Sequence, residues 1–109
     1  MREPVVIRTA FRRIDFETCE AFGVQLAAAL GEDATETVVI DLSAVEFMSS
    51  VGLRELVVAS KKSKAAGGTI VITGLQPLVR EVFTISRFDL LFPLYDTTRD
   101  ALVVLGAAG

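Results

Sequence analysis

The stretch VVIDLSAVEFMSSVGLRELVVASKKSKAA, from Val38 to Ala66, decides the fold. It opens on a β-branched run, within residues 37–42, that is too short and too uniformly apolar to be one face of a helix, which predicts a buried central strand. From Leu53 onward apolar residues recur at helical spacing, lysines crowd the far end, and a Gly-Gly pair follows. The stretch therefore predicts a strand, a tight crossing segment and a helix that begins near Ser49 or Ser50.

Further strands and helices are predicted on both sides of this centre. They comprise strands over 4–11, 69–73 and 91–95, and helices over 16–30, from Pro77 onward and from Thr97 to Leu105. Asp15 is the expected N-cap of the first helix. Pro93 suggests that the last strand lies at an edge of the sheet. In the third helix, Leu78, Val82, Phe83 and Ile85 are expected to face the core.

Alternating strands and helices predict an α/β domain. We expect one domain over 1–109, with a mainly parallel (mixed) sheet of about four strands and about four helices packed on it, because 109 residues support a single core. In such sheets, loops that leave the carboxyl ends of strands are the usual place for a site. The segment 41–50 is such a loop, and Asp41 is expected to hold it by bonding nearby backbone amides.

Composition narrows the classes of function. A net charge of −3 and a pI near 4.9 argue against nucleic-acid binding, which depends on clustered Lys and Arg. Histidine is absent and Cys19 is the only cysteine, so the usual zinc and Cys/His catalytic sites are unavailable. Neither GxGxxG nor GxxxxGK[ST] is present, and we expect no cofactor and no metal. With no apolar run of 18 residues and no secretory signal, we expect a cytoplasmic protein without membrane insertion.

The Ser49-Ser50 pair has two interpretations. A serine that opens a helix usually caps it by accepting a hydrogen bond from a free backbone amide. Alternatively, one hydroxyl is displayed for chemistry. A catalytic serine needs a base, and Lys61 would lie about three helical turns away, roughly 16 Å at 1.5 Å per residue. Nucleophilic catalysis by these serines is therefore disfavoured, whereas phosphorylation, which needs only exposure and a kinase, stays open.

VVIDLSAVEFMSSVGLRELV resembles the motif of the STAS domain family, in particular anti-sigma factor antagonists, where the helix opens on an acidic or serine residue followed by Ser, a small residue, Gly and Leu. The resemblance continues through KKSKAAGGTIVITGLQPLVREVFTISRFDLLFPLYDTTRDAL and includes the apolar-Asp step at Ile14-Asp15. It thus covers nearly the whole chain and implies a single STAS domain.

This resemblance implies a partner-switching protein. The unphosphorylated form would bind an anti-sigma factor that is also a serine kinase of the histidine-kinase-like ATPase type, and so release the sigma factor. Phosphorylation of Ser50, with Ser49 as second choice, would abolish binding, and a metal-dependent serine phosphatase would restore it. The implied partner-binding residues are Asp15, Met48, Ser49, Ser50, Val51, Gly52, Leu53 and Arg54. For Met48 and Val51 the alternative is a place in the core.

Three departures from the family pattern bear on these expectations. Ser49 stands where many members have Asp, and Arg12 stands where a glycine is common. The chain before the first strand is shorter than in many members, so a sheet edge they cover would be open, and we expect a monomer or a weak dimer. The alternative function is that of a constitutive, non-catalytic STAS adaptor subunit, for example in a lipid-transport ATPase complex, in which Ser50 would be only a cap.

Overall fold

The β-branched run forms an inner strand of a four-stranded sheet. In the computed structural model, which describes residues 3–106, the sheet order is β1-β3-β5-β6 and every neighbouring pair is parallel. The strands are β1 (Val5–Arg8), β3 (Thr37–Asp41), β5 (Thr69–Thr73) and β6 (Leu94–Tyr95). The predicted α/β class and strand number are confirmed. No antiparallel strand joins this sheet within the described residues, so it is parallel and not mixed.

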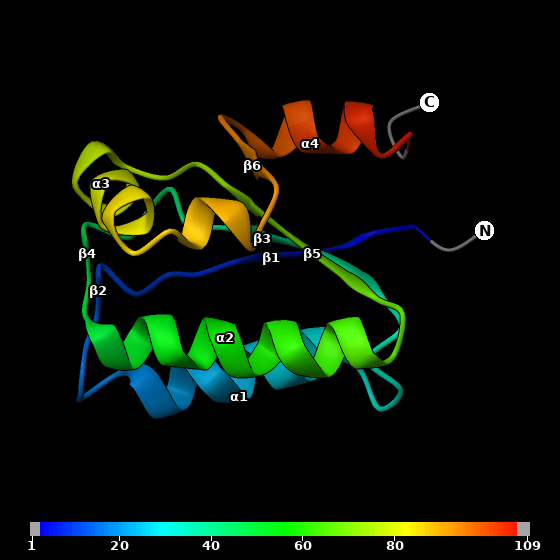
Figure 1. Cartoon of the computed structure of the whole chain (residues 1–109), viewed down its shortest axis with the longest axis horizontal. Helices are drawn as coiled ribbons and strands as arrows, with labels where there is room; N and C mark the ends of the chain where they lie inside the picture. Colours follow the sequence, from blue (N-terminus) through cyan, green and yellow to red (C-terminus); the bar gives the residue numbers. More distant parts are fainter. Residues whose placement is uncertain (1–2, 107–109) are drawn as a thin grey trace.

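Four helices cover the sheet, as predicted. They are α1 (Cys19–Leu30), α2 (Ser50–Ala65), α3 (Pro77–Ile85) and α4 (Thr98–Val104), and a short 3-10 turn, η1 (Phe88–Leu90), follows α3. Figure 1 shows α1 and α2 side by side on one face of the sheet, α4 on the other face, and α3 beside the end of the sheet at which α2 begins. Among the described residues, no helix is both long enough and apolar enough to cross a membrane.

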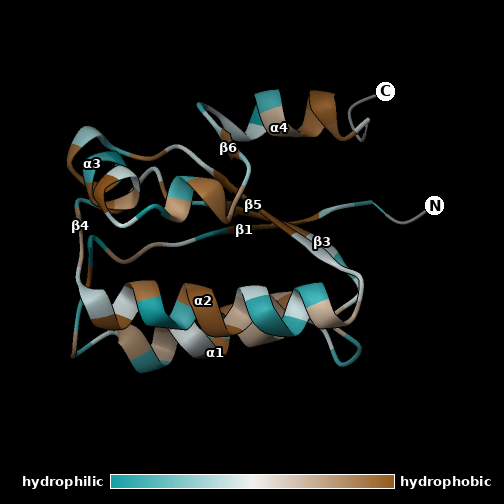
Figure 2. Cartoon of the chain, in the orientation of Figure 1, coloured by the Kyte–Doolittle hydropathy of each residue, from teal (hydrophilic) through white to brown (hydrophobic). Residues whose placement is uncertain are grey.

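The strand side chains alternate between two apolar layers. Val38 and Ile40 face the layer formed with α1 and α2, whereas Val39 faces Val71 and Ala101 beneath α4. Figure 2 shows the resulting hydrophobic colouring along the strands between the helical layers. Because both faces of β3 are buried, its sequence lacks the polar alternation of a half-exposed strand, which is why a continuous apolar run predicted it correctly.

A second, two-stranded ladder was not predicted from the sequence. β2 (Arg13–Ile14) pairs in parallel with β4 (Phe47–Met48), across more than thirty residues of chain. Strands of two residues are too short to show a period, so the sequence carries no signal for them. This ladder ties the segment before α1 to the segment before α2.

The first helix begins later than predicted. Its N-cap is Thr18 and not Asp15, because Asp15 closes a separate turn in which its Oδ1 accepts a hydrogen bond from the Glu17 amide at 3.0 Å. Phe16, expected inside the helix, lies in that turn with 85% of its surface exposed. The Asp15 side chain thus shapes the entry to α1 without capping it.

The C-terminal half differs from its prediction in two places. On α3, two of the four residues predicted to face the core do so, since Phe83 is buried and Val82 packs against the core. The prediction was wrong for Leu78 and Ile85, which are largely exposed, and it missed the buried Val79. The strand predicted over 91–95 is reduced to Leu94–Tyr95. It is an edge strand immediately after Pro93, as predicted, and the Pro93 carbonyl accepts a hydrogen bond from the Ile72 amide at 3.0 Å.

Candidate functional site

Ser50 is the first residue of α2, and it is exposed. Ser49 precedes it in an extended conformation, with φ −87° and ψ 174°, and the Ser49 carbonyl accepts the first bond of the helix from the Leu53 amide at 3.1 Å. The predicted helix start is confirmed. The hydroxyl of Ser50 therefore lies at the positive end of the 16-residue helix dipole.

Backbone hydrogen bonds hold this junction on both sides. The Ser49 amide donates to the Ile14 carbonyl at 2.9 Å, and the Glu46 amide donates to the Arg12 carbonyl at 2.7 Å. Both bonds extend the β2-β4 ladder. Since the chain is fixed immediately before Ser50, the direction of α2 and the position of its first turn follow from the ladder.

The two serines have opposite environments. The Ser49 Oγ is buried and, among the described residues, has no hydrogen-bond partner. It does not cap α2, so the first amides of the helix are not occupied by that side chain. Ser50 is exposed beside these amides. A phosphoryl donor could reach the Ser50 hydroxyl but not the Ser49 hydroxyl in this conformation.

The predicted partner-binding residues divide into two groups. Ser50 and Arg54 are exposed, and Asp15, Ser49 and Val51 are partly exposed. The side chains of Met48 and Leu53 are in the core, 2% and 8% exposed respectively. For Met48 the burial agrees with the alternative of a place in the core, and in this structure neither the Met48 nor the Leu53 side chain is exposed for contact with a partner.

Gly52 is also buried, and its lack of a side chain has a packing reason. A Cβ at this position would stand 2.6 Å from the Ile14 Cγ2 and 3.0 Å from the Met48 Cγ. The first turn of α2 thus lies directly against β2 and β4. Gly52 supports the position of Ser50 by allowing this close approach, and it does not form part of the exposed surface.

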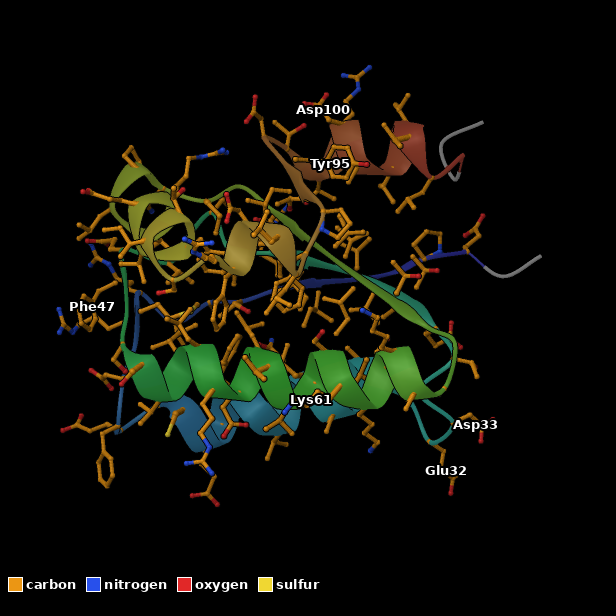
Figure 3. All side chains as sticks on the ribbon, viewed as in Figure 1. Glu32, Asp33, Phe47, Lys61, Tyr95 and Asp100 are labelled. Atoms are coloured by element: carbon orange, nitrogen blue, oxygen red, sulfur yellow. The ribbon has the colours of Figure 1, made fainter. Side chains whose placement is uncertain are left out.

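Charged and aromatic side chains surround the junction. The Arg13 guanidinium lies 4.5 Å from the centre of the Phe47 ring and 3.5 Å from the Asp15 carboxylate, while Arg12 pairs with Glu46 at 2.7 Å. Figure 3 shows Phe47 at the end of the molecule where α2 starts. Sequence reasoning missed Arg13 and Phe47 because the ladder that brings them together left no sequence signal. It missed the exposed Phe16 because that residue was expected inside the first helix.

Asp41 anchors the loop between β3 and the junction, as predicted. Its Oδ1 accepts from the Ser43 amide at 2.9 Å, and its Oδ2 accepts from the Thr98 Oγ1 at 3.1 Å and from the Arg8 Nε at 3.2 Å. Burial acts to raise the pKa of this carboxyl group, but the hydrogen bonds from Ser43, Thr98 and Arg8 outweigh it, so the pKa lies below its usual value. Asp41 is therefore a structural carboxylate at neutral pH.

Comparison with known families identifies the class of protein to which this α/β domain, with a serine at the start of α2, belongs. The family model described as the STAS domain matches residues 2–101, and this chain belongs to that family. Among its relatives, the anti-sigma-F factor antagonist RsfB of Mycobacterium tuberculosis is 34% identical over 90 residues, which cover 82% of this chain and 71% of RsfB.

Solved structures show the same fold. An anti-sigma factor antagonist from Mycobacterium paratuberculosis is 33% identical, with a TM-score of 0.77, and the match covers 95% of this chain and 86% of that one. The Bacillus cell fate determinant SpoIIAA in its phosphorylated form has a TM-score of 0.70 at 24% identity, covering 96% and 93% of the two chains. The predicted family is confirmed.

Proposed function

We propose that this protein is an anti-sigma factor antagonist that acts in the cytoplasm and is controlled by phosphorylation of Ser50. In this proposal the unphosphorylated form binds an anti-sigma factor that is also a serine kinase of the histidine-kinase-like ATPase type, and binding releases the sigma factor. The relatives named as anti-sigma factor antagonists support the regulatory role. The protein itself would act by binding and not by catalysis.

The exposed Ser50 hydroxyl at the start of α2 is the observation that carries the proposal. A phosphate there would add a charge of about −1.5 to −2 next to helix amides that Ser49 leaves unoccupied. Arg54 lies four residues further on, one helical turn away, and is exposed. The domain can therefore accommodate the phosphate locally while its fold is retained.

The same charge would prevent binding. An interface that covers a neutral hydroxyl would have to bury a dianion after phosphorylation, and an unpaired buried charge costs about 3 kcal/mol or more. That cost corresponds to a loss in affinity of about a hundredfold or more. Val51, Arg54, Asp15 and the partly exposed Phe47 are the nearby residues we propose as partner contacts, together with Phe16.

The decisive experiment incubates the protein with a candidate kinase of this type and ATP, followed by intact mass measurement and site mapping. Wild type should gain a single phosphate on Ser50, and Ser50→Ala should gain none. Ser86→Ala, which removes an exposed serine at the end of α3, is the matched control and should behave as wild type. A metal-dependent serine phosphatase should then restore the original mass.

Binding to the same kinase separates the proposal from its alternative. Ser50→Glu should bind about a hundredfold more weakly than wild type, by the cost of burying a charge. If wild type and Ser50→Glu bind equally and no phosphate appears on either serine, the switch is refuted. A constitutive adaptor role, with Ser50 as an ordinary helix-start residue, would then be the better explanation.

A further inference from the structure

A polar pocket lies where the four strands of the main sheet end. Each strand contributes a residue at its carboxyl end or immediately after it, namely Arg8, Asp41, Gly74 and Asp96, and α4 contributes Arg99. We call this the strand-end pocket. Its volume of about 300 Å³ is near the lower end of the range for small-ligand sites. In parallel sheets, this edge is where ligands usually bind.

The backbone at Gly74 keeps the pocket open on one side. Gly74 has a φ of +75°, a conformation that favours glycine. A Cβ at this position would stand 3.0 Å from the Ser43 Cβ and 3.2 Å from the Asp41 Oδ1, two residues that line the pocket. The Gly74 amide donates to the Tyr95 carbonyl at 3.2 Å, so its place is fixed. Bare backbone therefore forms this part of the wall, and a side chain there would press on the pocket.

Most charged groups of the pocket are paired. The Arg8 Nε donates to the Asp41 Oδ2 at 3.2 Å, and the Arg80 Nη2 donates to the Asp96 Oδ1 at 3.1 Å. Arg99 is exposed, and within residues 3–106 its guanidinium has neither an ion pair nor a hydrogen bond. The unpaired charge of the lining is therefore positive.

The free hydrogen-bonding groups are donors. Arg8 uses only its Nε in the bond to Asp41, so both of its Nη groups lack a partner among the described residues, as does the Arg99 guanidinium. The Asp41 carboxylate already accepts three hydrogen bonds. In the part of the chain that the structure describes, no cluster of acidic side chains could hold a metal ion. Free guanidinium groups beside an occupied carboxylate suit an anion and not a cation.

We propose that the strand-end pocket binds a small oxyanion, namely the phosphate group of inorganic phosphate or of a small phosphate ester. Arg8 approaches the pocket from β1 and Arg99 from α4, so their N–H groups come from two directions. Phosphate oxygens point in several directions and can accept from both guanidinium groups, whereas a planar carboxylate presents its two oxygens to one side. Among the described residues that line the pocket, none has an apolar side chain that would favour a hydrocarbon ligand.

The acidic residues around the pocket do not prevent anion binding. Asp41 and Asp96 are each bonded to an arginine, which offsets part of their repulsion. Asp100 follows Arg99 in α4, but it does not line the pocket. A bound phosphate would join Arg8 to Arg99 and so connect β1 to α4 through a second charged link, beside the one that Asp41 already makes.

The test titrates the complete, isotope-labelled chain with inorganic phosphate at constant ionic strength and follows the backbone amide signals by NMR. The signals of Gly74, Thr98 and Arg99 should shift in a saturable manner, with half-saturation at about 1 mM. Glycerol phosphate, titrated in the same way, distinguishes the two sources of the phosphate group. Tighter binding than that of inorganic phosphate identifies an ester as the ligand, and equal or weaker binding identifies free phosphate.

Two charge-matched variants locate the site. Arg99→Gln should weaken phosphate binding by about tenfold or more, because it removes a charged donor. Its fold should be retained, since the Arg99 side chain bonds to nothing within residues 3–106. Lys61→Gln removes the same charge from an exposed position of α2 and should bind phosphate as wild type does. Figure 3 shows Lys61 and Asp100, the neighbour of Arg99, on opposite sides of the molecule.

Two results would overturn the proposal. One is the absence of saturable shifts up to about 20 mM phosphate, and the other is equal weakening by Arg99→Gln and Lys61→Gln, which would mean an adventitious ion only. Shifts confined to Ser50 and its neighbours in α2 would likewise place the anion elsewhere and reject the strand-end pocket. The kinase experiment on Ser50 uses a different residue and readout, so the proposed function stands or falls independently of this titration.

Discussion

Ser49 and Ser50 are neighbours in the chain but differ in what surrounds their hydroxyls. The sequence placed both at the start of a helix and could not separate a cap from a displayed hydroxyl, because both functions use the same residue type. The structure distinguishes the two serines through a tertiary contact. The Ile14 carbonyl accepts a hydrogen bond from the Ser49 amide, and this bond fixes which side of the chain faces inward. Such a long-range contact, through a two-residue ladder, leaves no local pattern.

Replacement of Ser49 tests whether it acts as a cap. Loss of a serine cap usually costs about 1 kcal/mol, but the Ser49 Oγ accepts no bond from the helix and is buried without a partner among the described residues. Ser49→Ala should therefore leave the free energy of unfolding unchanged or raise it by up to about 1 kcal/mol, as measured by urea denaturation.

Thr97→Ala is the matched comparison, since the Thr97 Oγ1 does accept a bond from the Asp100 amide at 3.0 Å. That variant should lower the free energy of unfolding by about 0.5–2 kcal/mol. If Ser49→Ala costs as much as Thr97→Ala, then the Ser49 hydroxyl caps α2 in solution and is turned differently from the structure described above.

At the level of elements, the sequence predicted best where one pattern excluded the others. The strands β3 and β5 are apolar runs with β-branched residues, and α2 has a long helical period with a lysine-rich end and a Gly-Gly stop, so their positions were predicted almost to the residue. The start of α1 was missed because Asp15 can close a turn as well as cap a helix. The β2-β4 ladder was missed because it depends on tertiary contacts alone.

The helix α3 shows how two apolar stripes can compete. Its sequence, PLVREVFTI, allows one apolar face through Leu78, Val82 and Ile85 and another through Val79, Val82 and Phe83, and the predicted set combined the first of these with Phe83. Both have helical spacing, and the two differ by about one residue. The structure buries the second, since Val79 and Phe83 face the core while Leu78 and Ile85 are in solvent. Periodicity alone predicted the helix but not its orientation.

Alanine substitutions on adjacent positions of α3 test this orientation. Val79 is 1% exposed, so Val79→Ala removes buried methyl groups and should lower the free energy of unfolding by about 2 kcal/mol. Leu78 is 56% exposed, and Leu78→Ala should change the free energy of unfolding by less than about 0.5 kcal/mol, although this substitution removes more atoms than Val79→Ala does. Urea denaturation of the two variants measures these changes. A larger loss of stability for Leu78→Ala than for Val79→Ala would show that α3 buries Leu78 and not Val79.

At the level of the whole molecule, Asp41 joins parts that are far apart in the chain. Its carboxylate binds Arg8 of β1, the amide of Ser43 in the next loop, and Thr98 at the start of α4, and the Thr98 hydroxyl in turn bonds the Thr73 hydroxyl of β5 at 2.8 Å. Three strands and the helix on the second face of the sheet therefore meet at one buried charge. The loop that leads to Ser50 leaves from the same point.

The lowered pKa of Asp41 makes the stability of the fold depend on pH in a defined direction. A group with a pKa lower in the folded than in the unfolded chain contributes stability that is fully present above its unfolded pKa, about 3.9, and is lost as the pH falls through its folded value. The Asp41→Asn variant lacks this contribution. It should be less stable than wild type by about 1–3 kcal/mol at pH 7, and the difference should shrink below about pH 4.

Urea denaturation of wild type and Asp41→Asn between pH 7 and pH 2.5 measures this difference. The control is Asp89→Asn in the exposed turn η1, whose stability should follow that of wild type at each pH. Since the Asp41 carboxylate is the acceptor for three separate segments, its protonation should loosen β1 and α4 together, seen as faster amide exchange in both. If the gap between wild type and Asp41→Asn stays constant down to pH 2.5, the charge of Asp41 does not hold these elements together, and the shape of its side chain alone accounts for the effect.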